Sequence, residues 1–331
     1  MSTSSSSSVT CISERNYAAV MAQAVEPSIQ AVCTEGVFVR VRGEPIHWER
    51  YAKENFSATI AISHGFTESC EKYAEMIYYF LDAGYQVFIC DHRGHGRSYR
   101  AVKEPWLTHV EHFSDYIEDF HYFVTRIIKP QTEGKPLYLY AHSMGGAIGA
   151  RFLELYPDLF DRAVLTSPML ELNSGGLPMG LAKRFAQMKV RTGHERDSLF
   201  IHRPFSENEP FERSYGTSRA RYDYYLNKQA QTPHLQNSAA TYSWMLEALA
   251  VTAEVVKPEN CRSVTIPVLL FQAGHDDLVK PRGQQLFISQ IAHGRLVRIP
   301  DAKHEIYRSS NRVLQPYLSE LLQFFDGGAE Q

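Results

Sequence analysis

One serine of this chain stands where the sequence changes abruptly, within LYLYAHSMGGAIGA at positions 137–150. The residues before Ser143 favour a buried strand, and the small residues after it favour the start of a closely packed helix. A sharp strand-to-helix turn exposes a serine hydroxyl for nucleophilic attack, provided that the residues two before and two after it are small. Ala141 and Gly145 meet that condition, although alanine stands where the usual pattern has glycine. We therefore interpret Ser143 as a nucleophile, with a helix cap as the alternative.

A histidine has to activate this serine, because a hydroxyl is a weak nucleophile at neutral pH. Around a nucleophile on such a turn, the acid and then the histidine follow later in the chain. His304, in DAKHE, directly follows the strand-like stretch RLVRIP, so its loop is expected to overhang Ser143. We predict His304 as the base, since His293 precedes that stretch and His275 adjoins the acidic candidates.

A carboxylate has to orient the histidine and stabilise its positive charge. The preceding strand-like stretch, VLLFQAG, leads into GHDD at 274–277. We predict Asp276 as the acid and keep Asp277 as the alternative, although an aspartate here could also serve only to form a turn. Together with Ser143 and His304, this carboxylate would support attack on a carbonyl carbon and an acyl-enzyme intermediate.

Attack on an ester places negative charge on the carbonyl oxygen, which two backbone N–H groups should stabilise. We assign one to Met144, the residue after the nucleophile, and the other to Phe66, in the loop HGFT that follows ATIAIS. Gly65 lets the chain turn there. His64 precedes Ser143 in the chain, so we expect it to hold a structural hydrogen bond and not to act as the base.

The elements that would position these residues alternate along most of the chain. We predict strands at 58–65, 85–92, 137–142, 162–169, 265–274 and 295–300, and helices at 73–81, 114–128, 143–156, 282–291 and 312–325. The strands are nearly continuous in apolar residues, which indicates an α/β fold whose mostly parallel sheet is covered by helices on both faces. Before them we expect a helix over 14–25, ended by Pro27, and extended segments at 36–41 and 45–51.

The alternation stops in the middle of the chain. Residues 171–261 show mostly helical spacing and no convincing strand. We therefore predict a mainly helical lid inserted into one α/β core, which residues 13–170 and 262–331 would form. Residues 1–12, with their run of serines, are expected to be a disordered tail.

The composition excludes several classes of function. Hydrophobic residues make up 44% and charged residues 21% of the chain, which is ordinary for a globular protein. A net charge of −3 lacks the basic surplus of nucleic-acid-binding proteins, so we expect no nucleic-acid partner. The five cysteines are dispersed, which argues against a disulfide framework or a zinc site. The chain shows no secretory signal and no apolar stretch long enough to span a bilayer, so we expect a cytoplasmic protein.

Several motifs resemble those of one family. SHGFTES, CDHRGHGRS, AHSMGGAI, GHDDLV and DAKHE are similar to motifs of the serine α/β-hydrolases that include monoacylglycerol lipases and bacterial lysophospholipases. The resemblance extends from about Glu14 to Phe325. Within the group it is strongest to the bacterial lysophospholipases associated with the inner membrane, through TSRARY, TYSWMLEAL, KHEI and the alanine at position 141.

This resemblance implies an α/β-hydrolase fold with a lid, acting on the ester of a single-chain lipid without a metal or organic cofactor. It also implies that Asp91, Arg93 and Gly94 form a structural loop. His92 and His95 in the same loop are too few ligands to predict a metal site.

Two parts of the insertion could contact lipid. In LPMGLAKRFAQMKVR, one helical face carries the apolar residues Leu177, Leu181, Phe185 and Met188, and the basic residues Lys183, Arg184, Lys189 and Arg191 lie largely elsewhere. We favour a lid helix packed on the core, with peripheral docking on an anionic membrane surface as the alternative.

Further along, Arg219 and Arg221 are candidate contacts for a phosphate head group, because arginine binds phosphate through paired hydrogen bonds. The alternative is that this arginine and tyrosine cluster packs the lid helices.

The hypothesis that best fits these patterns is a carboxylic ester hydrolase that releases a fatty acid from lysophospholipids. A monoacylglycerol lipase, an acyltransferase or a peptidase on the same fold are alternatives, because only the lid and the acceptor site would distinguish them. A non-catalytic binding protein on a hydrolase scaffold is a further alternative. The predicted partner is a single-chain lipid, with no obligate protein partner evident.

Overall fold

The computed structural model describes residues 9–174 and 178–327, which form an eight-stranded sheet in the order β1-β2-β4-β3-β6-β7-β9-β10. The parallel strands are β3 (Ala58–Ser63), β4 (Tyr85–Cys90), β6 (Leu137–His142), β7 (Arg162–Thr166), β9 (Val268–His275) and β10 (Gly294–Lys303). At one edge β1 (Cys33–Val39) and β2 (Pro45–Tyr51) pair antiparallel. The mostly parallel sheet confirms the predicted α/β fold class.

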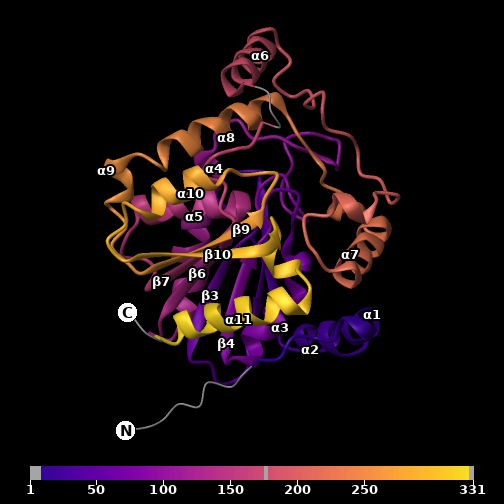
Figure 1. Ribbon diagram of the computed structural model, residues 1–331, viewed down its shortest axis with the longest axis vertical. Coiled ribbons are helices and arrows are strands. Elements are labelled where there is room, and N and C mark those ends of the chain that lie inside the picture. The colour runs from indigo at the N-terminus through magenta and orange to yellow at the C-terminus, as the bar shows by residue number, and fades with distance from the viewer. Residues whose placement is uncertain (1–8, 175–177, 328–331) are drawn as a thin grey trace.

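Helices cover both faces of this sheet (Figure 1). One face carries α4 (Ser114–Tyr122), α5 (Ser143–Leu155) and α10 (Pro281–Ile288), and the other carries α3 (Ala74–Asp82) and α11 (Asn311–Phe325). Consecutive strand residues alternate between the two cores, as in Leu139 and Tyr140. Side chains of a strand point to opposite faces, so a strand buried on both faces reads as one apolar run.

Short helical turns connect these elements. They are Cys70–Tyr73, Phe123–Ile128, Lys129–Gln131, Phe211–Arg213, Pro233–Leu235 and Ile306–Arg308. The turn over Phe123–Ile128 continues α4 with π-helical bonds, so the helix predicted over 114–128 is confirmed in extent.

The segment between β7 and β9 contains α6 (Met179–Arg191), α7 (Arg219–Gln231), α8 (Tyr242–Glu254) and α9 (Pro258–Cys261). It also holds a strand of two residues, β8 (Ala239–Ala240), which pairs with β5 (Leu107–Thr108) and was not expected from the sequence. In Figure 1, α8 crosses above the core, α6 projects beyond it at the tip of the molecule, and α7 lies at the side near α1.

Part of the predicted N-terminal tail is packed on the core. Val9, Cys11 and Ile12 are buried, and the Cys11 N–H donates to the side chain of Gln315 on α11. The prediction of a disordered tail over 1–12 is therefore wrong for residues 9–12, because these apolar side chains have a core surface to cover. Residues 1–8 lie outside the described residues.

The first helix does not end at Pro27. A turn at Glu14–Asn16, α1 (Tyr17–Val20), a π-helical turn at Met21–Val25 and α2 (Glu26–Gln30) follow one another without a break. The π turn separates two α-helical segments, so Pro27 occupies the first turn of a new one. The missing N–H of a proline is not needed there, which is why the predicted break does not occur.

Candidate active site

The residues predicted to do chemistry meet at one edge of the sheet. Ser143 directly follows β6, Asp276 follows β9, and His304 follows β10. The loop that holds Phe66 follows β3, the neighbour of β6. Because these strands are parallel, their carboxyl ends lie together, and ligands of open α/β sheets bind at that edge.

The turn at Ser143 is strained in the way that an exposed nucleophile requires. Ser143 has a φ of +52°, in the left-handed region that residues other than glycine rarely adopt. The chain passes so close to β3 that a Cβ at Gly145 would lie 2.0 Å from the carbonyl oxygen of Ser63. Only glycine fits there, which explains the second small residue of the motif.

The first small residue of the motif is alanine because its methyl group has room. Ala141 is fully buried, and a Cβ at Gly149 on α5 would lie 3.2 Å from the Ala141 Cβ. The missing side chain at Gly149 therefore accommodates the extra methyl group. The departure from G-x-S-x-G leaves the backbone of the turn intact.

The three predicted triad side chains form a hydrogen-bonded chain. His304 Nε2 lies 2.7 Å from Ser143 Oγ, and His304 Nδ1 lies 2.7 Å from Asp276 Oδ2. The Leu278 and Val279 N–H groups donate to Asp276 Oδ1 at 2.9 and 3.0 Å. The carboxylate thus orients the imidazole so that Nε2 faces the hydroxyl and can take its proton.

Asp276 is held in its charged form. Burial raises the pKa of this carboxyl. The hydrogen bond from His304, the electrostatic attraction to His304 and the two backbone N–H groups outweigh burial and lower the pKa below its usual value. An ionised carboxylate is the form that stabilises an imidazolium at His304.

The alternative candidates for the acid and the base, Asp277 and His293, do not belong to this series of hydrogen bonds. Both ring nitrogens of His304 are used by Ser143 and Asp276, and Asp277 is exposed to solvent. His293 precedes β10 and so lies at the opposite end of that strand.

The two backbone N–H groups that the sequence predicts for the oxyanion hole remain candidates by their hydrogen bonding. Met144 lies in the first turn of α5, so its N–H has no carbonyl partner within the helix. The Phe66 N–H has no acceptor among the described residues, whereas the Gly65 N–H donates to Glu68 Oε2 at 2.6 Å. The Phe66 ring packs on the ring of Trp244 in α8 at 4.3 Å.

His64 has a structural role at this loop. Its Nε2 accepts from the His92 N–H at 2.9 Å, so the ring proton is on Nδ1, which donates to the Gly65 carbonyl at 2.8 Å. Burial lowers the pKa of His64, which keeps it neutral and able to accept. Because the Gly65 carbonyl and the Phe66 N–H belong to one trans peptide, they point in opposite directions. His64 therefore turns the Phe66 N–H away from itself.

The loop after β4 is built around one buried carboxylate. Asp91 accepts the Cys70 N–H at 2.7 Å and the Arg97 N–H at 2.9 Å. Gly96 has a positive φ, and a Cβ there would lie 2.1 Å from Asp91 Oδ2. Arg93 of this loop pairs with the Asp119 carboxylate of α4 at 2.8 Å. These contacts are those of a scaffold loop.

The histidines of this loop are used in hydrogen bonds. His92 Nε2 lies 2.9 Å from Ser63 Oγ, and His95 Nδ1 donates to the Arg93 carbonyl at 3.0 Å. Burial lowers the pKa of His92 and of His95 well below the usual value.

Among the described residues, the side chains that approach closely enough to share a metal ion are Glu35, His47 and Glu49, on β1 and β2.

The two candidate head-group arginines lie in different environments. Arg221 is 2% exposed and pairs with Glu75 at 2.6 and 2.8 Å. The prediction that Arg221 contacts a head group is therefore wrong, because its guanidinium is buried and binds Glu75, which holds α7 to the core. Arg219 pairs with Asp223 one helical turn further along α7, and its side chain is exposed. Its contact with a head group stays a prediction.

The first helix of the insertion shows its apolar face to solvent. Leu181, Phe185 and Met188 are 56%, 38% and 50% exposed, and Ala186 is the buried residue of α6. The favoured prediction, a lid helix with its apolar face packed on the core, is wrong for these side chains. The helix packs on α8, with the centroid of the Phe185 ring 5.8 Å from that of the Tyr242 ring. Leu177 lies outside the described residues.

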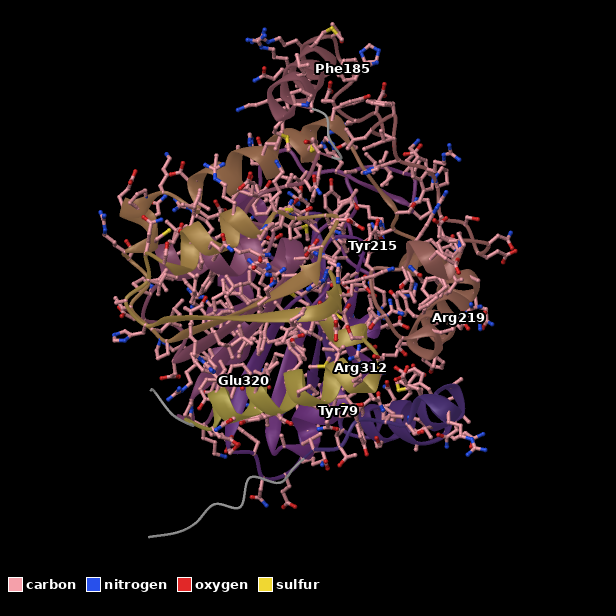
Figure 2. All side chains as sticks on the ribbon, viewed as in Figure 1. Tyr79, Phe185, Tyr215, Arg219, Arg312 and Glu320 are labelled. Atoms are coloured by element: carbon pink, nitrogen blue, oxygen red, sulfur yellow. The ribbon has the colours of Figure 1, made fainter. Side chains whose placement is uncertain are left out.

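The triad is nearly covered by the insertion. Ser143 is 8% exposed. The Glu305 N–H donates to the Tyr215 carbonyl at 2.8 Å, and the Tyr215 ring lies 6.4 Å from the His304 ring. Figure 2 places Tyr215 between the sheet and α7. Sequence reasoning missed Tyr215, which stands just before the motif TSRARY, and Glu68, which stands inside the motif SHGFTES.

Comparisons with known proteins identify a family and relatives with a similar fold. The profile of a family described as serine aminopeptidase, S33 matches residues 54–311. Lysophospholipase L2 of Escherichia coli is 30% identical over 300 residues, which cover 88% of this chain and 87% of the relative. A monoacylglycerol lipase of Mycolicibacterium smegmatis is 24% identical over 77% of this chain and 84% of its own length. A monoglyceride lipase from Saccharomyces cerevisiae has a similar fold, with a TM-score of 0.73 at 17% identity over 91% of this chain and 96% of that one.

Proposed function

Because this chain belongs to the serine aminopeptidase S33 family and is a serine ester hydrolase of the α/β-hydrolase fold, we propose that its substrates are lysophospholipids. The observation that carries the chemistry is the chain of 2.7 Å hydrogen bonds from Ser143 through His304 to Asp276. The substrate class is supported by the 30% identity to a lysophospholipase over 88% of the chain.

The geometry suits a two-step mechanism. Ser143 Oγ attacks the acyl carbonyl carbon while His304 Nε2 takes the hydroxyl proton, and the Phe66 and Met144 N–H groups stabilise the oxyanion. The tetrahedral intermediate collapses as His304 gives the proton to the glycerol oxygen, which leaves. Water then loses a proton to His304 and attacks the acyl-enzyme. His304 returns this proton to Ser143 Oγ as the fatty acid leaves, which restores the serine. Asp276 stabilises the imidazolium in both steps.

Fatty-acid release from four substrates tests this proposal. Lysophosphatidylcholine, lysophosphatidylethanolamine, monoacylglycerol and p-nitrophenyl butyrate are compared for the wild type and Ser143→Ala. We expect the lysophospholipids to have the highest kcat/KM and the substitution to cost about 10³-fold or more. An inactive variant with monoacylglycerol as the preferred substrate would keep the triad and replace the substrate class. Wild-type protein that releases no acid from any substrate would contradict hydrolysis altogether.

Monoacylglycerol lipase activity is the second candidate. The observation that favours it is the set of relatives that carry this name, including the mycobacterial enzyme. A monoacylglycerol lacks the phosphate group, so the two functions differ in what the insertion has to recognise.

We also propose that α6 contacts a lipid surface peripherally. Its exposed Leu181, Phe185 and Met188 are extended by Phe200, whose ring lies 5.9 Å from that of Phe185. The neighbouring Lys183, Arg184 and Arg191 are exposed and pair with no acidic side chain among the described residues. Such a basic amphipathic helix binds anionic lipid in the plane of the interface. No helix in the described part of the chain has the length and hydropathy of a membrane span.

A further inference from the structure

A second buried carboxylate lies behind the catalytic residues. Glu68 is 3% exposed and follows the loop that presents the Phe66 N–H. Its Oε2 accepts the Gly65 N–H at 2.6 Å and the Tyr73 hydroxyl at 2.6 Å. Its Oε1 accepts the Tyr307 hydroxyl at 2.7 Å. A carboxylate with this many donors is fixed in position.

Glu68 is also connected to the segment that follows the catalytic histidine. Lys72 Nζ lies 3.1 Å from Glu68 and 2.6 Å from Glu305, the residue after His304. Tyr307 belongs to the same turn after His304. One side chain therefore bonds both to the oxyanion loop and to the segment that carries the catalytic base.

The bond to Gly65 controls the geometry of the oxyanion loop. The peptide between Gly65 and Phe66 is held at its carbonyl by His64, as described above. Glu68 holds the preceding peptide of Gly65 through its N–H. With both peptides held, the Phe66 N–H has a single direction. An N–H donor stabilises an oxyanion effectively only when it already points at the oxyanion position before the reaction.

The carboxylate keeps its charge. Burial raises the pKa of Glu68, but Lys72, His142 and the hydroxyls of Tyr73 and Tyr307 outweigh burial and lower it well below the usual value. Glu68 therefore remains a charged acceptor for the Gly65 N–H at neutral pH, which makes that hydrogen bond short and strong.

We propose that Glu68 is a positioning residue, which aims the Phe66 N–H at the oxyanion by fixing the Gly65 N–H. This inference rests on the proposed ester hydrolysis. It assigns Glu68 no contact with substrate.

The chain offers a closely matched control. Glu75 is a buried carboxylate that accepts the hydroxyls of Tyr17 and Tyr79 at 2.8 and 2.6 Å and pairs with Arg221. Glu68 likewise has two tyrosine hydroxyls and one cation. The relevant difference is that Glu68 in addition accepts a backbone N–H from the oxyanion loop. Glu75→Gln therefore removes a similar buried charge without that bond.

The experiment compares p-nitrophenyl butyrate with its thionoester, in which sulfur replaces the carbonyl oxygen. Sulfur is larger and a weaker acceptor, so the thionoester gains little from donors aimed at an oxyanion. The kcat/KM for the ester divided by that for the thionoester reports how well the Phe66 N–H is directed at the oxyanion. This ratio does not depend on the fraction of folded enzyme. We expect Glu68→Gln to lower the ratio about tenfold or more, and Glu75→Gln to leave it within about twofold of wild type.

A Glu68→Gln ratio equal to that of the wild type would overturn the proposal, as would an equal fall for Glu75→Gln. If wild-type enzyme hydrolyses neither ester, ester hydrolysis itself fails, which is a different outcome.

A second variant approaches the same contact from the other side, in case Glu68→Gln does not fold. A Cβ at Gly65 would lie 2.8 Å from Glu68 Oε2, so Gly65→Ala should displace the carboxylate. We expect this variant to lower the ratio as well. An unchanged ratio in folded Gly65→Ala would contradict the proposal.

Discussion

The two long helices at the start of the insertion, α6 and α7, have the same length and opposite relations to the rest of the molecule. α7 is anchored: Arg221 pairs with Glu75 in the core, and Lys228 pairs with Glu26 and Glu71 at 3.0 Å. α6 buries one residue and exposes its apolar face. Figure 2 shows the contrast between Arg219 on α7, beside the core, and Phe185 at the tip.

This difference separates two tasks that a lid can have. α7 continues from the segment of Tyr215 that touches the loop of His304, so its ion pairs fix one wall of the active site. α6 packs on α8, and its exposed apolar and basic side chains support the lipid contact that we propose for it. The insertion therefore combines an anchored helix with a helix whose apolar face is exposed, and we propose the second as the docking face.

Breaking the anchor should have the largest effect on stability. Arg221→Met leaves Glu75 buried without its cation, so we expect the free energy of unfolding to fall by about 3–5 kcal/mol. Arg219→Met, two residues away and exposed, should cost less than about 0.5 kcal/mol. Urea unfolding of both variants measures the difference. Equal losses would show that α7 is not held by Arg221.

Acidification should weaken the fixed part of the molecule. Burial lowers the pKa of His92 and His95 well below the usual value, and that of His142 to about 4. As the pH falls below the unfolded value of about 6.5, the unfolded chain takes up these protons first, so stability is lost with falling pH. Each of these three histidines contributes about 1.4 kcal/mol between pH 7.5 and 5.5, so we expect a fall of about 4 kcal/mol in the free energy of unfolding.

The pH experiment uses the same urea titrations, repeated in buffers of constant ionic strength. Stability that stays constant or rises on acidification would contradict the burial of neutral histidines.

Removing the apolar face of α6 should weaken lipid binding. With both Leu181→Asp and Phe185→Asp, we expect binding to phosphatidylglycerol vesicles to fall about 10²-fold, because two apolar side chains no longer insert. Leu286→Asp on α10 alters an exposed leucine elsewhere and should leave binding unchanged. Co-sedimentation with vesicles measures this. Equal binding by the α6 variant and the wild type would exclude α6 as the docking face.

The smallest effect is expected at Arg219. Because this arginine pairs with Asp223 on its own helix, we expect Arg219→Met to change the preference for lysophosphatidylethanolamine over monoacylglycerol by less than about twofold. A change of about tenfold would establish the head-group contact that the sequence suggested. The ratio of kcat/KM for the two substrates gives the answer.

The sequence predicted the sheet and the grouping of the candidate triad well, for identifiable reasons. Parallel strands buried on both faces leave long apolar runs, so their positions are visible. Chain order and strand ends then restrict the histidine to His304. For the acid the sequence leaves two candidates, because Asp276 and Asp277 are adjacent and only the direction of each side chain in the folded loop distinguishes them.

Features that depend on packing between distant segments were not predicted. Arg219 and Arg221 are separated by about 200° around a helix, so they had to face different surroundings, but the sequence does not say which side meets the core. The apolar face of α6 gives the same pattern whether it is covered or exposed. The role of Glu68 depends on Tyr307, which is far away in the chain.

Fatty-acid release from lysophosphatidylethanolamine by Asp276→Asn and Asp277→Asn tests the central claim most directly, because the two variants remove the same charge one residue apart. Loss of the Asp276 carboxylate leaves His304 without its orienting partner. We expect a fall in kcat of about 10³-fold or more for Asp276→Asn and near wild-type rates for Asp277→Asn. Equal effects of the two substitutions, or full activity in Asp276→Asn, would contradict it.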